Sequence, residues 1–358
     1  DEVMAVFRAA DAANAFTERG REVYGRVKRV YDDGIDRGGD LSPLGAEQHR
    51  EIAARMYRNF PEVFRSGAVV DAQATLVVRC VLSMAAFCER LKELNPRLEV
   101  SRTAGRRTTR YLNFYSKPTN PTLSREYLDF IDKGGWQEEY ERIGDRFVRP
   151  GRLMSELFAD GEFVRTIDAQ KLMKGLFYFA ADMQNVGLGI SFYDLFTTDE
   201  LYGLNVYDNY KYYVIRGPSP LNRRFPQYYA KALLEDFLMR ADRAVEGGAV
   251  SADLRFGHDG NLMTFVSLLQ FEGCDVVESD PEKIAQMWPL YRISPMAANI
   301  QLVFYRKKAS DDVLVKFLYN EREVRIPVAS DLAPYYRWND VRDFYRNVME
   351  NLPDPAGK

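Results

Sequence analysis

The sequence has few of the residues from which most metal and nucleophile sites are built. Its 358 residues include only two histidines, His49 and His258, and three cysteines. No metal-ligand spacing joins these residues, so we expect no zinc site and no other cofactor. An apolar run of about 18 residues is also missing, which argues against a membrane-spanning helix.

Charge of one sign is not in excess either. The formal net charge is −3, with 46% hydrophobic and 28% charged residues, which is typical of a soluble globular protein. A protein that binds nucleic acid by bulk electrostatics is usually basic, so the composition argues against that function. It leaves room for a local basic pocket that binds a small anion.

The cysteines leave the redox compartment open. Cys80 and Cys88 lie eight residues apart on a predicted helix, roughly 12 Å along its axis, which is too far for a disulfide between them. We expect buried thiols, although either helical cysteine could pair with Cys274.

The chain is organised around the stretch Arg255–Leu262, which contains Gly-His-Asp-Gly. The alternating run at 250–256 predicts a strand, and the apolar run at 262–269 predicts a helix. A strand that turns into a helix places His258 and Asp259 at the carboxyl end of a sheet. Open α/β folds bind their ligands at that edge.

A second strand-to-helix turn has the same form. Residues 68–72 predict a short strand, and 76–94 predict a helix with Arg79 in its first turn. A cation there opposes the helix dipole, unless the guanidinium and the helix N–H groups share an anionic partner.

The remaining elements complete an α/β fold class. We predict a large α/β domain, formed by residues 1–111 and 246–358, with a mixed, partly parallel sheet flanked by helices. A mostly helical domain at 112–245, with a turn at 117–121, is inserted into it. Within these domains we expect a helix at 2–31, a helix from Pro43, strands at 300–306, 313–318 and 324–328, and a closing helix at 338–352. The segment 204–218 is hard to assign and could be a helix that ends at its Gly-Pro.

His258 and Asp259 permit several kinds of chemistry. A metal-dependent phosphohydrolase needs further histidines, and only His49 is available. A Ser-His-Asp triad is disfavoured because adjacent residues cannot easily form its hydrogen bond and no Gly-x-Ser-x-Gly elbow occurs. In phosphoryl transfer, His258 donates to a phosphoryl oxygen, Asp259 is the general acid, and Arg79 clamps the phosphoryl group. A capped turn without catalytic function is the remaining interpretation.

Three segments resemble the histidine acid phosphatases of the phytase branch. Gly257-His258-Asp259-Gly260-Asn261-Leu262 is similar to the family's Gly-His-Asp-x-Asn-Leu proton-donor motif. Leu41-Ser42-Pro43-Leu44-Gly45 is similar to its Leu-Thr-Pro-x-Gly stretch. The segment from Ala74 to Phe87 resembles the one that supplies a phosphate-binding arginine. Its Arg-Cys-x-x-Ser-x-x-Ala-Phe form, beginning at Arg79, is closest to the multiple inositol polyphosphate phosphatases.

The resemblance implies a function for these residues. Asp259 would be the proton donor, and Arg79 and His258 would bind the phosphate of an inositol polyphosphate such as phytate, without a metal. It further implies a periplasmic or secreted enzyme. Additional cations would bind the other phosphates, and the candidates are Arg102, Arg106, Arg107, Lys211 and Arg216. Each is also compatible with a solvated surface; the arginines at 101–110, for example, could lie in an exposed loop.

The chain departs from the family in one respect. The family's nucleophile is the histidine of an Arg-His-Gly-x-Arg motif, which does not occur here, and His49 lies in another context. We expect the motif to precede Asp1 in the full protein, where its histidine would form a phosphohistidine intermediate. The alternatives are a broad-specificity acid phosphatase of the same fold and a non-catalytic phosphate-binding relative. The sequence does not indicate an oligomeric state.

Overall fold

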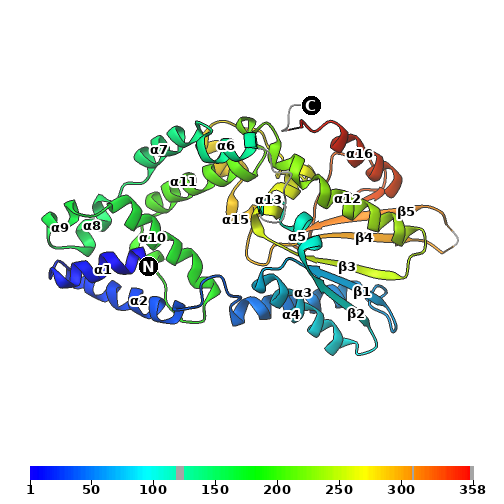
Figure 1. Cartoon of the computed structure of the whole chain (residues 1–358), viewed down its shortest axis with the longest axis horizontal. Helices are drawn as coiled ribbons and strands as arrows, with labels where there is room; N and C mark the ends of the chain where they lie inside the picture. Colours follow the sequence, from blue (N-terminus) through cyan, green and yellow to red (C-terminus); the bar gives the residue numbers. More distant parts are fainter. Residues whose placement is uncertain (118–124, 309, 355–358) are drawn as a thin grey trace. The chain divides into compact units, whose positions relative to one another are not determined.

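The computed structural model of the chain describes residues 1–117, 125–308 and 310–354 (Figure 1). It forms two compact units, each assembled from separate stretches of the chain. One unit combines Asp1–Leu44 with Gln137–Asp208, and the other combines Gly45–Trp136 with Asn209–Lys358. None of the described helices is both long and apolar enough to cross a membrane.

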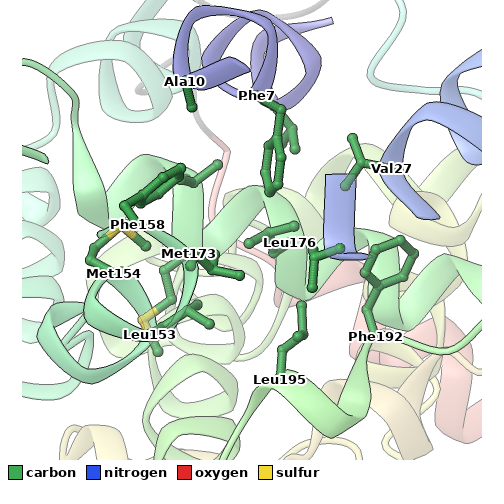
Figure 2. Packing of buried hydrophobic residues seen from close by; sticks show 14 of the residues in the cluster. Phe7, Ala10, Val27, Leu153, Met154, Phe158, Met173, Leu176, Phe192 and Leu195 are labelled. Atoms are coloured by element: carbon green, nitrogen blue, oxygen red, sulfur yellow. The ribbon is translucent and has the colours of Figure 1, made fainter. Parts of the chain in front are cut away.

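The first unit is mainly helical. Its core contains Phe7, Met173 and Leu176, which are fully buried and point toward one another (Figure 2). Its elements are α1 (Glu2–Ala12), α2 (Glu18–Gly34), α7 (Trp136–Phe147), α8 (Gly151–Leu157), α9 (Gly161–Arg165), α10 (Ala169–Asp182), the 3₁₀ turns η1 (Met183–Asn185) and η2 (Tyr193–Leu195), and the first part of α11 (Thr198–Arg216).

The helix predicted at 2–31 is two helices. The chain leaves the helical conformation after Ala12, and Asn14 has a positive φ of 50°. Thr17 then caps α2, since its side chain accepts a hydrogen bond from the Gly20 N–H. In the connection between the two helices, Phe16 forms an isolated β-bridge with Phe158. Apolar residues recur at helical spacing on both sides of the break, which is why the sequence predicted one helix.

The boundaries of the two units differ from those of the predicted domains. Residues 1–44 pack with 137–208, because the apolar face of α1 is buried against α10 in one shared core. Helix α12 (Phe225–Val245) belongs to the larger unit, where its Arg240 pairs with Asp71 and Asp253 of the sheet. Periodicity identified these helices, but it carries no information about which partner each apolar face covers.

A parallel sheet lies in the larger unit. Strands β1 (Val69–Ala74), β2 (Glu99–Ala104) and β3 (Val250–Phe256) are arranged in the order β2-β1-β3, all parallel. Ala74 at the end of β1 is in register with Ala104 of β2 and Phe256 of β3. The carboxyl ends of the strands therefore lie at one edge.

Helices surround this sheet. The buried face of β1 packs on α4 (Val78–Leu94), which contributes Cys80, Met84 and Phe87 to the core as its apolar pattern predicted. The other elements of the unit are α3 (Pro43–Asn59), α5 (Arg106–Leu112), α6 (Arg125–Lys133), η3 (Pro220–Asn222), α13 (Asp259–Leu268), α14 (Pro281–Met287), α15 (Leu290–Ile293) and α16 (Trp338–Glu350).

The opposite face of the sheet is polar. Arg240 of α12 donates to Asp71 on β1 at 2.8 Å, to Asp253 on β3 at 2.7 Å and to Asp236 at 3.1 Å. Arg255 also reaches Asp236 at 3.1 Å. This ion network joins α12 to two strands, so it fixes the helix over the sheet.

The second sheet is antiparallel. Strand β5 (Val313–Tyr319) pairs with β4 (Ile300–Arg306) on one side and with β6 (Arg322–Glu323) and β7 (Tyr335–Arg337) on the other. The third strand predicted at 324–328 is wrong: β6 ends at Glu323, and Pro327 lacks the N–H that a ladder needs. Both parallel and antiparallel strands occur, as predicted. Among the described residues, however, they form two separate sheets and not one mixed sheet.

Other expectations are resolved by the larger unit. The stretch 101–110 is part of β2 and α5 and not a loop, and the unassigned segment from 204 belongs to α11. Residues 118–121 of the predicted turn lie outside the described residues. Cys80, Cys88 and Cys274 are all buried free thiols, so neither helical cysteine pairs with Cys274.

Candidate active site

The ends of β1 and β3 bring the two predicted site segments together. The Thr75 N–H donates to the Phe256 carbonyl at 3.2 Å, which extends the pairing of the two strands by one residue. Thr75 to Arg79 and Gly257 to Asp259 therefore leave the sheet side by side. The strand-turn-helix pattern predicted this edge correctly for both segments.

His258 and Asp259 begin the helix α13. His258 is the N-cap in an extended conformation, and Asp259 is the first helical residue. The Asp259 side chain is exposed, and its Oδ1 accepts the Gly260 N–H at 2.8 Å. A carboxylate in the first turn is favourable because it interacts with the positive end of the helix dipole. Asp259 can thus reach a bound molecule without breaking a structural ion pair.

Arg79 and His258 are close enough to influence one another. Arg79 is the second residue of α4 and is exposed. Burial lowers the pKa of His258, and the positive charge of Arg79 lowers it further, while Asp259 opposes the shift. At neutral pH the imidazole is therefore largely uncharged, and the positive charge beside it is that of Arg79.

Two buried side chains hold the His258 ring. Thr75 Oγ1 lies 3.2 Å from its Nε2. The Cys80 thiol donates to the Gly257 carbonyl at 3.1 Å and lies 3.9 Å from Nδ1. Burial raises the pKa of Cys80, so the thiol stays protonated. Sequence reasoning missed both supports, because only the pairing of β1 with β3 brings them to His258.

Two threonines of α5 hold the loop after β1. The Thr108 hydroxyl donates to the Ala74 carbonyl at 2.8 Å, and Thr109 Oγ1 accepts the Leu76 N–H at 3.0 Å. Both threonines are buried. Consecutive threonines after Gly105 were the available signal, since hydroxyl groups near a helix start commonly bind adjacent backbone.

Arg216 lies close to the first turn of α13. Its guanidinium stacks 3.7 Å over the Tyr115 ring, and its Nη1 donates to the Tyr127 hydroxyl at 3.1 Å. A Cβ atom added to Gly260 would lie 3.3 Å from Arg216 Nε, so glycine permits this approach beside Asp259. Among the described residues the Arg216 guanidinium contacts Tyr115, Tyr127 and the Ile215 carbonyl and no carboxylate, so its charge can bind another anion.

Comparison with known proteins identifies the fold. A model of the histidine phosphatase superfamily (branch 2) matches residues 22–320. This chain belongs to that superfamily. Its matched region includes β1, α4, β3 and the start of α13, so the recognition of the family from Gly257–Leu262 and Arg79–Phe87 is confirmed.

Solved histidine phosphatase structures have the same fold. The multiple inositol polyphosphate phosphatase of Bifidobacterium longum, in complex with inositol hexasulfate, gives a TM-score of 0.79 at 20% identity over 95% of this chain and 86% of that one. Its complex with phosphate gives 0.79 at 20% identity over 98% and 89%. The phytase from D. castellii gives 0.69 at 14% identity over 98% and 75%. No curated protein sequence matches.

The other cations predicted to bind substrate in this histidine phosphatase do not lie together. Arg106 and Arg107 are exposed at the start of α5, just past the carboxyl end of β2. Arg102 lies within β2, in register with Ala72, and is set back from that edge. Lys211 precedes Arg216 by five residues on α11, roughly 7.5 Å along the helix axis. The structure therefore favours Arg106, Arg107 and Arg216 as neighbours of the edge.

His49, the second histidine, is part of the packing. It lies on α3, and its ring meets Phe256 edge-on with centroids 6.1 Å apart. Burial lowers its pKa. Nothing links His49 to Arg79 or Asp259 in the hydrogen bonds of the described residues, and no cluster of metal ligands occurs among them.

Proposed function

We propose that this histidine phosphatase hydrolyses phosphomonoesters of inositol polyphosphates through a phosphohistidine intermediate. The observation that carries the proposal is the convergence of Arg79, His258 and Asp259 at the carboxyl edge of β1 and β3. A cation, a hydrogen-bonding imidazole and an exposed carboxyl group are the parts that phosphoryl transfer requires.

Each residue would have a separate role. Arg79 would clamp two phosphoryl oxygens, because a guanidinium presents paired donors that match them. His258 would donate to a third oxygen. Asp259 would protonate the departing alkoxide and then activate water to cleave the phosphohistidine, by general acid and general base catalysis in turn.

The nucleophilic histidine would come from a segment outside the 358 residues. His49 is a poor alternative, since its ring packs on Phe256. Among the described strands, β3 pairs only with β1 and β4 only with β5. An edge of β3 is thus open to a further strand, and a residue at the end of such a strand would lie beside His258.

The proposed substrate class follows from charge around the edge. Inositol polyphosphates carry several phosphates, so the pocket needs cations beyond Arg79. Arg216, Arg106 and Arg107 supply them near the edge, with Arg102 and Lys211 as more distant candidates. A relative of the same fold binds inositol hexasulfate, whose sulfate esters are tetrahedral anions like phosphate esters.

The experiment compares substrates on the full-length protein. Phosphate release is measured with phytate and with an aryl phosphate, and the protein is quenched in base to trap phosphohistidine. A preference for phytate, together with ³²P from labelled substrate on a histidine of the quenched protein, supports the proposal. Preference for the aryl phosphate indicates a broad acid phosphatase, and binding without turnover indicates a non-catalytic relative.

We also propose, from the family resemblance, a periplasmic or secreted location, which cell fractionation tests.

A further inference from the structure

Thr75 occupies a position from which it can control His258. Its residue is completely buried, so its hydroxyl cannot touch a bound substrate. Its main chain is fixed by the N–H bond to the Phe256 carbonyl at 3.2 Å, and its Oγ1 lies 3.2 Å from His258 Nε2. The Thr75 hydroxyl can therefore act on the site only indirectly, through the imidazole ring and through the Val77 N–H before α4.

The two nitrogens of the ring are in different surroundings. Nε2 is engaged by Thr75. In the described structure, the only group near enough to bond Nδ1 is the Cys80 sulfur, at 3.9 Å, and the same sulfur lies 4.0 Å from Nε2. That thiol directs its own hydrogen to the Gly257 carbonyl at 3.1 Å, and sulfur is a weak acceptor. Nδ1 is thus the nitrogen left for a ligand.

The direction of the Thr75 hydrogen bond is linked to the ligand that faces the other nitrogen. Thr75 Oγ1 accepts the Val77 N–H at 3.4 Å with one lone pair, so its hydroxyl can either donate to Nε2 or accept from an Nε2–H. Burial lowers the pKa of His258, and Arg79 lowers it further, which favours the neutral ring. A phosphoryl oxygen only accepts hydrogen bonds, so a neutral ring that faces it with Nδ1 must carry its proton there, and Nε2 must then accept the Thr75 hydroxyl.

We propose that Thr75 is a positioning residue that holds His258 in the Nδ1–H tautomer, so that Nδ1–H is the donor to a phosphoryl oxygen. The phosphoryl ligand and the choice of tautomer rest on the proposed function, whereas the contact between Thr75 and Nε2 rests on the geometry alone. The opposite tautomer would present an unprotonated Nδ1, whose lone pair repels a phosphate oxygen. The Thr75 hydroxyl is therefore needed for anion binding although it never meets the anion.

The tautomer can be measured directly, because the chain has only two histidines. Histidine labelled with ¹⁵N is followed by long-range ¹H–¹⁵N NMR at pH 7.5, and the ring signals that disappear in His258→Asn are those of His258. We expect a protonated Nδ1 and an unprotonated Nε2. An Nε2–H tautomer or an imidazolium at this pH overturns the proposal.

Two variants separate positioning from packing. In Thr75→Val, which keeps the shape but removes the hydroxyl, Nε2 should become protonated, and affinity for inorganic phosphate in the full-length protein should fall about tenfold. Thr75→Ser should retain the Nδ1–H tautomer and lose less than about threefold. An unchanged tautomer in Thr75→Val contradicts the proposal. If that variant does not fold, the wild-type and Thr75→Ser spectra still decide.

Phosphate titration separates this inference from the function on which it partly rests. Added inorganic phosphate should shift the Nδ1 resonance of His258 in the full-length protein. A shift confined to Nε2 overturns the tautomer proposal. If neither nitrogen responds while Nδ1 is protonated, the role of Thr75 in setting the tautomer stands, and the phosphatase assignment of the site fails.

Discussion

Asp259 combines exposure with a fixed position. It begins α13, and within the described part of the chain its carboxylate bonds only the adjacent Gly260 N–H, at 2.8 Å. A side chain in this situation contributes little to the packing of the core. Its replacement should therefore change chemistry without unfolding the protein.

Asp259→Asn keeps the shape of the side chain but removes its transferable proton. We expect kcat of the full-length protein to fall by about two to four orders of magnitude, the contribution typical of general acid–base catalysis. The dissociation constant of the substrate should change less than about threefold. Stopped-flow phosphate release and calorimetric binding measure the two effects, and near-normal turnover would remove Asp259 from the proposed role.

Arg216 should contribute to affinity according to the number of phosphates on the ligand. Its guanidinium is held on Tyr115 and Tyr127 beside Gly260. Arg216→Met should weaken inositol hexakisphosphate binding about tenfold, the scale of a lost charge-assisted hydrogen bond. Binding of inorganic phosphate should be nearly unchanged. Arg216→Lys is the matched control, because it keeps the charge but not the planar donors. If Arg216→Met weakens the binding of inositol hexakisphosphate and of inorganic phosphate equally, Arg216 does not form a second phosphate site.

His49 should make stability depend on pH. Burial lowers its native pKa below the ordinary value of 6.5, so the unfolded chain binds the proton more tightly. Stability is therefore full above about pH 6.5 and falls as pH decreases from there toward the native pKa. His49→Gln should flatten this part of the curve, measured by urea unfolding from pH 5 to 8. An unchanged slope would show that the burial of His49 has no such effect.

Among the elements, those with a simple burial pattern were predicted well. Strand β3 was predicted at its observed bounds, and α4 began two residues later than expected. Strand β2 was missed, because Glu99–Ala104 lies at the sheet edge and is largely exposed, so its residues do not alternate in hydrophobicity. The support of His258 by Thr75 could not be predicted, since it depends on strand pairing between residues 183 positions apart.

The polar layer between α12 and the sheet should be important for stability. Arg240 donates to Asp71, Asp236 and Asp253. Arg240→Met removes one of the two cations from three half-buried carboxylates and leaves Asp71 without an arginine, so we expect a loss of about 2–4 kcal/mol in the free energy of unfolding. Urea denaturation followed by circular dichroism measures it.

An exposed ion pair provides the control for that variant. Arg337 pairs with Asp331, and both side chains are substantially exposed. Arg337→Met should cost less than about 0.5 kcal/mol. If Arg240→Met is no more destabilising than this control, the layer is not the structural clamp that its geometry indicates.

At the scale of the whole molecule, the candidate catalytic groups all belong to one unit. Arg79, His258 and Asp259 lie in the unit formed by Gly45–Trp136 and Asn209–Lys358, and so does Arg216. The sequence predicted a helical region and an α/β region, but it placed residues 1–44 in the α/β region and α12 in the helical region. In the structure, residues 1–44 belong to the mainly helical unit and α12 belongs to the unit that contains the sheets. Membership in a unit depends on long-range packing, to which local patterns contribute little.

The central claim is that this edge of the sheet is a phosphatase active site for inositol polyphosphates. The most direct measurement is a ³¹P NMR time course of phytate with the full-length protein, with the Asp259→Asn variant alongside. The account predicts stepwise loss of phytate phosphates to inorganic phosphate, strongly slowed in the variant. Phytate that remains intact, or is hydrolysed equally fast by both proteins, would contradict it.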